Sequence, residues 1–160
     1  MNSGVVRILE AGEKAPSFSL LDQAGKRVSL ADFKGRRLVV YFYPQDDTPT
    51  CTAQACEFRD GWSDLQAAGA VVLGISPDTP EAHQRFRAKF GLPFPLLADE
   101  AHAVAKAFGV WGEKSLYGRT VIGMIRTTFI IDGTGVIERV FPRVRTKGHA
   151  ARVLAALTAS

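Results

Sequence analysis

Cysteine and long apolar runs are both scarce in this 160-residue chain. It has two cysteines, Cys51 and Cys56, too few for the disulfide framework of a small secreted domain. A closely spaced pair in a reducing compartment favours catalysis or metal binding instead. No segment approaches the roughly 18 consecutive apolar residues of a membrane helix, and residues 1–16 lack the apolar core of a signal peptide. We therefore expect a cytoplasmic protein with no membrane partner.

Histidine is also scarce, and its distribution argues against metal. His83, His102 and His149 are dispersed and show no ligand spacing with the cysteines. We expect each histidine to be a structural residue on the surface or on a helix face. The sequence therefore predicts no metal site and no cofactor.

Charge is moderate, with a net value of +4. The basic residues form two small clusters, Lys34, Arg36 and Arg37, then Arg143, Arg145 and Lys147. No nucleic-acid motif accompanies them and the aromatic residues do not alternate with them, so we interpret both clusters as solvated loops and expect no nucleic-acid partner. Hydrophobic residues at 46% and charged residues at 22% are ordinary for a globular protein. The length suits a single domain over residues 1–160.

Strand and helix patterns alternate along the chain. Apolar or alternating runs predict strands at 17–21, 27–30, 38–43, 70–76, 96–98, 127–132 and 136–141, the last two flanking a glycine-rich hairpin turn. Capping residues and helical spacing predict helices from residue 49 to about 68 and over 80–90, 101–108 and 147–157. The glycine-rich stretch 109–123 is expected to be the longest loop. This order predicts an α/β fold, a mixed central sheet with helices on both faces.

The two cysteines lie where a strand passes through a turn into a helix. Pro44 ends the strand, because proline donates no amide. Thr48 followed by Pro49 predicts an N-cap and a first helical residue, which makes Cys51 the third residue of the helix. A free thiol is only about 3% ionised at pH 7, and a helix N-terminus favours the reactive thiolate. Position alone leaves two interpretations open, a reactive thiolate or a small buried apolar residue.

The spacing of Cys56 from Cys51 adds a geometric constraint. Five residues along a helix rotate by roughly 140° and rise by about 7.5 Å, so the two Cα atoms lie roughly 8.6 Å apart. A disulfide needs less than about 7 Å. The cysteines are therefore either unrelated or partners in a redox cycle with local unwinding, and spacing alone does not choose.

The residues around the cysteines match a known active-site pattern. Pro44, Thr48 and Cys51 have the spacing proline, three residues, threonine or serine, two residues, cysteine. With the segment CTAQACEFRD, the chain resembles the peroxiredoxins, and within them the Q-type branch also called bacterioferritin comigratory protein. The similarity extends to GEKAPSFSLLDQAG, HQRFRAKFGLPFPLLAD, FGVWGEKSLYGRTVIGMIRTTFIID and RVRTKGHA. One difference is Thr50, where most Q-type members have glycine, which leaves the local loop geometry open.

The resemblance implies a thioredoxin-like fold and a thiol-dependent peroxidase that reduces hydrogen peroxide and organic hydroperoxides. Cys51 would attack the peroxide and become a sulfenic acid, and Cys56 would resolve it as an intramolecular disulfide. The Thr48 hydroxyl would face the thiolate and peroxide, Pro44 would shield the site from water, and the Arg126 guanidinium would stabilise thiolate and transition state. Without the resemblance, Arg126 would be interpreted as a surface charge. Whether the Thr48 hydroxyl caps the helix or serves the substrate stays open.

The resemblance also implies the partners, namely a peroxide substrate and a thioredoxin or glutaredoxin-like reductant, with the protein a monomer or weak homodimer. Two other functions can be weighed against it. A thioredoxin-like disulfide oxidoreductase needs a CxxC pair, which the chain lacks. A binding or holdase protein needs an exposed apolar stripe or a disordered arm, and the sequence shows neither.

Overall fold

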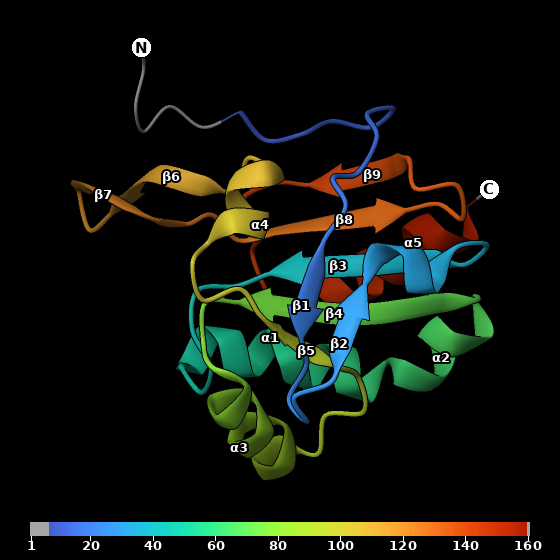
Figure 1. Cartoon of the computed structure of the whole chain (residues 1–160), viewed down its shortest axis with the longest axis horizontal. Coiled ribbons are helices and arrows are strands. Elements are labelled where there is room, and N and C mark those ends of the chain that lie inside the picture. The colour runs from blue at the N-terminus through green and yellow to red at the C-terminus, as the bar shows by residue number, and fades with distance from the viewer. Residues whose placement is uncertain (1–6, 160) are drawn as a thin grey trace.

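A seven-stranded mixed sheet is the centre of the fold in this computed structural model, which describes residues 7–159 (Figure 1). No signal peptide was predicted in residues 1–16, and residues 1–6 of that segment lie outside the described residues. The strand order is β2-β1-β5-β4-β3-β8-β9. These strands are β1 (Ser19–Leu21), β2 (Arg27–Ser29), β3 (Arg37–Phe42), β4 (Ala70–Ser76), β5 (Leu96–Ala98), β8 (Thr127–Ile131) and β9 (Ile137–Phe141).

Helices cover both faces of this sheet, as the sequence predicts. They are η1 (Leu30–Phe33), a 3-10 turn, and α1 (Pro49–Asp60), α2 (Trp62–Ala67), α3 (Pro80–Phe90), α4 (Ala103–Ala107) and α5 (His149–Thr158). One apolar cluster joins the sheet to α4 and η1, and a second joins the opposite face to α1, α2, α3 and α5. No helix within residues 7–159 has the length and apolar character needed to cross a bilayer.

Strand β3 lies in the interior of the sheet and leads into the segment that contains Cys51. It pairs in parallel with β4 and antiparallel with β8. Because successive side chains of a strand alternate between faces, Val40 and Phe42 enter one apolar cluster while Val39 and Tyr41 enter the other. A central strand buried on both faces explains the continuous apolar run in the sequence.

The helix that follows β3 is shorter than the sequence predicts. One helix was expected to reach about residue 68, but α1 ends at Asp60 and α2 starts at Trp62. The break is at Gly61, whose freedom of backbone conformation weakens a helix interior. Helix-type bonds continue on each side, from the Gly61 N–H to the Glu57 carbonyl and from the Leu65 N–H to the Gly61 carbonyl, both over 3.0 Å.

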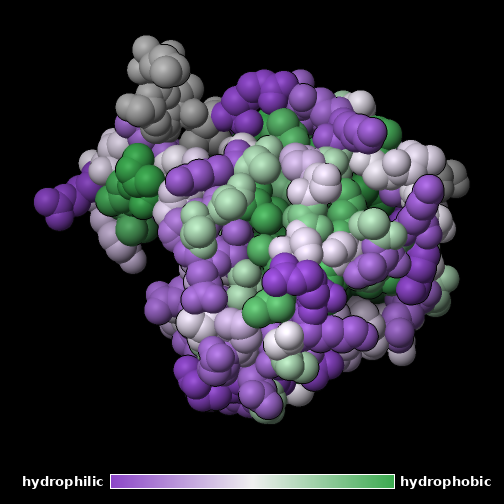
Figure 2. All heavy atoms as spheres, viewed as in Figure 1, coloured by the Kyte–Doolittle hydropathy of each residue, from purple (hydrophilic) through white to green (hydrophobic). Residues whose placement is uncertain are grey.

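The prediction of a long loop at 109–123 is wrong. Strands β6 (Trp111–Leu116) and β7 (Arg119–Met124) form an antiparallel hairpin that extends beyond the sheet (Figure 1). Tyr117 and Gly118 make its turn, both with positive φ, 52° and 76°. Two such residues suit a two-residue hairpin turn, but tyrosine is a rare choice for the first. Figure 2 shows apolar atoms on this hairpin, where Leu116 and Ile122 are exposed.

Candidate active site

Cys51 lies at the start of α1, where the sequence placed it. Thr48 is the N-cap with extended backbone, φ −94° and ψ 155°, and Pro49 is the first helical residue. Cys51 is therefore third, and its exposed fraction is 2%. The first N–H groups of a helix have no intrahelical acceptor, and the helix dipole places partial positive charge there. This location favours a negatively charged sulfur.

The Thr48 hydroxyl does not cap the described helix. It donates to the Gln45 carbonyl oxygen over 3.1 Å, and no first-turn N–H group within residues 7–159 bonds to its oxygen. The backbone prediction for Thr48 as N-cap is confirmed, while the hydroxyl is used within the turn before the helix. Its oxygen keeps its lone pairs, so in this conformation Thr48 can still accept a hydrogen bond.

The Arg126 guanidinium connects this helix to the sheet. Nη2 donates to the Cys51 Sγ over 3.2 Å, and Nη1 donates to the Gln54 Oε1 over 2.6 Å. Thr127, the first residue of β8, pairs with Phe42, the last residue of β3. Arg126 comes one residue earlier and therefore lies just beyond the end of β3. A planar guanidinium with several donors can hold both partners at once. The structure thus brings together two of the residues that the sequence nominated, Cys51 and Arg126.

Gln54 is a site residue that the sequence analysis missed. It lies three residues after Cys51, so both side chains share a face of α1, and its exposed fraction is 1%. Its oxygen accepts from Arg126, whereas its Nε2 has no hydrogen-bond partner within residues 7–159. The available signal was a polar residue at helical spacing from the cysteine on the buried face.

A hollow of about 490 Å³ lies beside Arg126. Its lining includes Pro44, Lys114, Met124, Arg126 and Val144, so two predicted site residues, Pro44 and Arg126, share this recess. The Lys114 ammonium donates to the Met124 carbonyl oxygen over 2.7 Å. Burial, followed by the charge of Arg126, lowers the pKa of Lys114, and Cys51 opposes this shift. Lys114 was missed because its strand was predicted to be a loop.

Aromatic side chains form the apolar floor of the site. The Tyr41 and Phe58 rings stack with centroids 4.8 Å apart, and Tyr41 also stacks on Tyr43 at 5.3 Å. Burial raises the pKa of Tyr41 well above 10, and the charges of Asp46 and Cys51 act in the same direction. A neutral, dry floor strengthens the electrostatic interaction between Arg126 and a thiolate.

Cys56 lies further along the same helix. It is half-buried, and both cysteines within residues 7–159 are free thiols. Because α1 is helical from Pro49 to Asp60, the two Cα atoms keep the helical separation of roughly 8.6 Å. The structure is the dithiol form with an intact helix.

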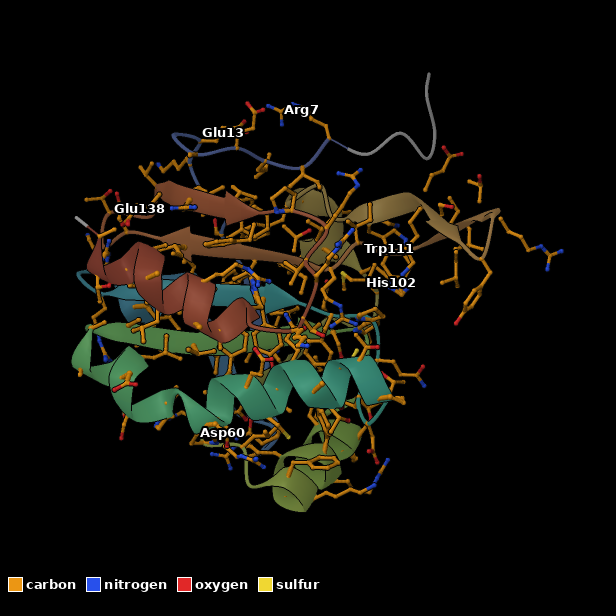
Figure 3. All side chains as sticks on the ribbon, turned by 180° about the vertical axis from the view of Figure 1, so that it is seen from behind. Arg7, Glu13, Asp60, His102, Trp111 and Glu138 are labelled. Atoms are coloured by element: carbon orange, nitrogen blue, oxygen red, sulfur yellow. The ribbon has the colours of Figure 1, made fainter. Side chains whose placement is uncertain are left out.

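The histidines were expected to be structural residues on the surface or on a helix face, and two of them lie buried on helices. His83 in α3 is fully buried and His149 at the start of α5 is 1% exposed. His102, the N-cap of α4, stacks on Trp111 with ring centroids 3.7 Å apart (Figure 3). Within the described part of the chain, no three histidine, cysteine or acidic side chains are grouped to hold a metal ion.

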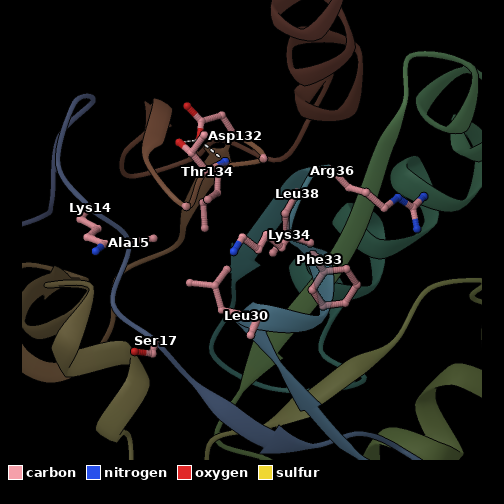
Figure 4. A pocket seen from close by; sticks show the side chains of 14 residues that line it. Lys14, Ala15, Ser17, Leu30, Phe33, Lys34, Arg36, Leu38, Asp132 and Thr134 are labelled. Carbon is pink, nitrogen blue, oxygen red and sulfur yellow. Dashed lines mark hydrogen bonds between the residues drawn. The ribbon is translucent and has the colours of Figure 1, made fainter.

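A second hollow, of about 250 Å³, carries no comparable chemistry (Figure 4). It is lined by Lys34 and Leu38 near the start of β3 and by Asp132 after β8, at the end of the sheet opposite Cys51. The Asp132 carboxylate is occupied within its own turn, where it accepts from the Thr134 hydroxyl over 2.7 Å. The reactive groups are thus concentrated at the other end of the sheet.

Known proteins match this chain over most of its length. The model of the AhpC/TSA family matches residues 11–140. A putative peroxiredoxin bcp of Coxiella burnetii is 50% identical over 149 residues, which cover 93% of this chain and 99% of the relative. Peroxiredoxin Bcp of Escherichia coli K12 is 53% identical over 141 residues, covering 88% of this chain and 90% of the relative.

Solved structures have a similar fold over nearly the whole chain. Peroxiredoxin Q of Xanthomonas campestris superposes with a TM-score of 0.85 at 36% identity, covering 96% of this chain and 97% of that one. A structure of the bacterioferritin comigratory protein of X. campestris, from work on its alkyl peroxide reduction activity, also gives 0.85, at 35% identity, with 97% and 98% coverage.

Proposed function

This chain belongs to the AhpC/TSA family and is a peroxiredoxin, a thiol-dependent peroxidase with a thioredoxin-like fold, and we propose that Cys51 is its peroxidatic cysteine and Cys56 its resolving cysteine. One observation carries the proposal. A guanidinium nitrogen of Arg126 lies 3.2 Å from the sulfur of a buried cysteine at a helix start. That arrangement stabilises a thiolate and directs donors to the place where peroxide must bind.

In the first step the Cys51 thiolate attacks one peroxide oxygen. The S–O bond forms as the O–O bond breaks, and the electron pair leaves with the second oxygen, which takes a proton and departs as water or an alcohol. Cys51 becomes a sulfenic acid. Arg126 and the N–H groups of Thr50 and Cys51 stabilise the negative charge on the departing oxygen. Hydrogen peroxide and organic hydroperoxides are the proposed substrates.

Pro44 and Thr48 complete the proposed site. Pro44 lines the recess beside Arg126 and has no N–H group with which to hold water, which suits a shield over the thiolate. The Thr48 hydroxyl donates to Gln45 in the dithiol form, so in our proposal its oxygen accepts a hydrogen bond from the peroxide. This assigns Thr48 to the substrate rather than to the helix N-terminus.

In the second step the Cys56 thiolate attacks the sulfenic sulfur. The S–S bond forms, and the hydroxyl group of the sulfenic acid leaves as water after taking a proton. Because the cysteines are too far apart on an intact helix, α1 must unwind between them. A thioredoxin or glutaredoxin-like dithiol then reduces the disulfide. The proposal includes a single domain over residues 1–160 that works in the cytoplasm as a monomer or weak homodimer, without cofactor, membrane or nucleic-acid partner.

A coupled assay tests this function. Consumption of hydrogen peroxide and of an alkyl hydroperoxide is measured with thioredoxin or glutaredoxin as electron donor, and reduction of a protein disulfide is measured in parallel. We expect peroxide turnover with at least one donor and no turnover of the disulfide substrate. The reverse result would instead assign the protein to the disulfide oxidoreductases.

A further inference from the structure

His83 makes two buried hydrogen bonds that no step described above uses. Its Nε2 lies 2.9 Å from the Leu97 carbonyl oxygen of β5. Its Nδ1 lies 2.6 Å from the Asp46 Oδ2, in the segment 44–48 that joins β3 to α1. His83 is fully buried and the Asp46 side chain is 6% exposed. The pair therefore connects α3 directly to the segment that leads into Cys51.

Asp46 is fixed by further bonds from neighbouring elements. Its Oδ1 accepts from the Tyr43 hydroxyl over 2.6 Å, and its backbone N–H donates to the Asp78 Oδ2 over 2.8 Å. The same Asp78 oxygen accepts from the Ser76 hydroxyl over 2.6 Å. Five residues before Cys51, the chain is thus tied to the residue after β3, to the loop after β4 and to α3.

The contact between His83 and Asp46 requires one proton. A carbonyl oxygen only accepts, so Nε2 must donate to Leu97. If Nδ1 and Oδ2 were both unprotonated, two lone pairs would face each other across 2.6 Å. One proton therefore lies between these two atoms. Removal of either side chain leaves a buried polar group without its partner.

The remaining groups around His83 complete the electrostatic environment. Tyr43, the residue after β3, faces it with ring centroids 6.5 Å apart, and burial and Asp46 raise the pKa of Tyr43 well above 10, so the phenol stays neutral. The Asp78 carboxylate accepts a hydrogen bond from the Asp46 backbone N–H, and the Leu97 carbonyl oxygen of β5 lies next to the His83 Nε2. One turn along α3, Arg87 donates to the Phe94 carbonyl oxygen over 3.2 Å. Asp46 is thus the group that shares the proton.

We propose that the Asp46–His83 pair is a latch that positions the segment before Cys51 for attack on peroxide, and that its release favours the unwound form in which Cys56 reaches Cys51. The inference rests on the proposed roles of the two cysteines. Asp46 and His83 are positioning residues, since they act through the backbone that enters α1. Loosening the latch should therefore change the two chemical steps in opposite directions. Attack needs the folded site and slows, whereas disulfide formation needs the unwound helix and accelerates.

The chain offers a matched control for removal of the latch. Lys89 of α3 forms an ion pair with Asp47 over 2.8 Å, which joins the same helix to the same segment. The two side chains are 59% and 46% exposed, and exposed pairs contribute little. Lys89→Ala therefore removes a surface link while the buried latch stays in place.

Asp46→Asn is the conservative variant that keeps the geometry of the latch. Its amide oxygen can accept from Tyr43, and its NH₂ group can donate to a neutral Nδ1 of His83 while Nε2 still donates to Leu97. All the bonds of the latch are then satisfied without the shared proton. The variant should therefore retain the positioned segment.

The test is a single-turnover rapid-quench experiment with hydrogen peroxide that follows sulfenic acid and disulfide by mass. Asp46→Ala and His83→Leu should slow sulfenic acid formation severalfold and accelerate disulfide formation about tenfold. Combining both changes should add little to either alone, because they remove one interaction. Lys89→Ala and, at neutral pH, Asp46→Asn should match the parent.

Several results would overturn the latch. They are unchanged rates in Asp46→Ala and His83→Leu, a slowing of both steps together, or rates in Asp46→Asn that follow those of Asp46→Ala. If the alanine and leucine variants fail to fold, His83→Gln replaces them, because its amide can still donate to Leu97 while the contact to Asp46 is lost. Unchanged rates in that variant would likewise overturn the latch. If the parent makes no Cys51–Cys56 disulfide, the proposed function fails instead. Amide exchange of the reduced proteins then tests the latch separately, and equal protection of residues 45–51 in Asp46→Ala and Lys89→Ala would overturn it.

Discussion

The Arg126 guanidinium donates a hydrogen bond to the Cys51 sulfur over 3.2 Å. The two residues are 75 positions apart in the sequence and meet because β8 starts beside the end of β3. A charge-assisted donor in a partly dry site stabilises a thiolate and the negative charge that develops on the departing oxygen. In the function proposed above, this contact places Arg126 beside the reacting sulfur.

Arg126→Ala and Arg126→Lys should both slow the peroxide step, by about tenfold to a thousandfold. Lysine keeps the charge but loses the fork that reaches Cys51 and Gln54 together. Stopped-flow measurement of sulfenic acid formation gives the rate. Alkylation of Cys51 at fixed pH should slow in Arg126→Ala, because the thiolate loses its cationic neighbour. A folded Arg126→Ala protein with the parent rate would show that Arg126 takes no part in the peroxide step.

Gln54 should matter through the orientation of Arg126. Gln54→Leu removes the oxygen that holds Nη1 and should slow the peroxide step about tenfold. The same stopped-flow assay measures this rate, and a folded Gln54→Leu protein with the parent rate would contradict the orienting role.

Disulfide formation should loosen both ends of a contact between α1 and α5. The Glu57 carboxylate accepts from the backbone N–H groups of Gly148 over 2.9 Å and Ala150 over 3.4 Å. Unwinding of α1 moves Glu57 away and leaves the α5 N-terminus without this partner. The disulfide form should therefore show faster amide exchange over residues 50–59 and in the first turn of α5, and a lower melting temperature than the dithiol form. Unchanged exchange in a confirmed disulfide form would argue against unwinding.

His149 should make the protein less stable in acid. Burial, followed by the charges of Arg152 and Arg126, lowers the pKa of His149 from 6.5 to about 4. Between these values the unfolded chain binds a proton that the folded protein does not. The free energy of unfolding is therefore highest above pH 6.5 and falls as pH decreases towards about 4, by up to about 3 kcal/mol. Above pH 6.5 this residue adds no pH dependence.

A variant isolates the contribution of His149. His149→Gln keeps a polar group near the Thr128 hydroxyl, which lies 2.8 Å from Nε2, and removes the titration. Urea unfolding at neutral and mildly acidic pH should show a smaller loss of stability in the variant than in the parent. Identical pH slopes would show that His149 is not the responsible group.

Local signals predicted much of the frame. Strands β4 and β5 have the bounds expected from apolar runs that end at proline or a polar residue, and the Thr48-Pro49 pair placed Cys51 at the third helical position. The resemblance to peroxiredoxins, carried by Pro44, Thr48 and Cys51, is confirmed at the level of the family. These features depend on residues that are close together in the sequence, so local patterns are enough to predict them.

Features that depend on distant contacts were not predicted. Gln54 and Lys114 matter because each contacts a residue or carbonyl of the β7–β8 region, and no local pattern marks such a partner. The β6–β7 hairpin was missed because its strands are largely exposed and its turn uses tyrosine at positive φ. His83 and His149 are buried by elements far along the chain, so their helical positions gave no sign of burial.

The central claim, that Cys51 attacks the peroxide and Cys56 resolves the product, is tested most directly by peroxide stoichiometry in two variants. Cys56→Ser should consume about one equivalent of hydrogen peroxide and stop with a sulfenic acid on Cys51, seen by mass as one added oxygen, which excess peroxide oxidises further. Cys51→Ser should consume none. Full turnover with thioredoxin in Cys51→Ser would contradict the account.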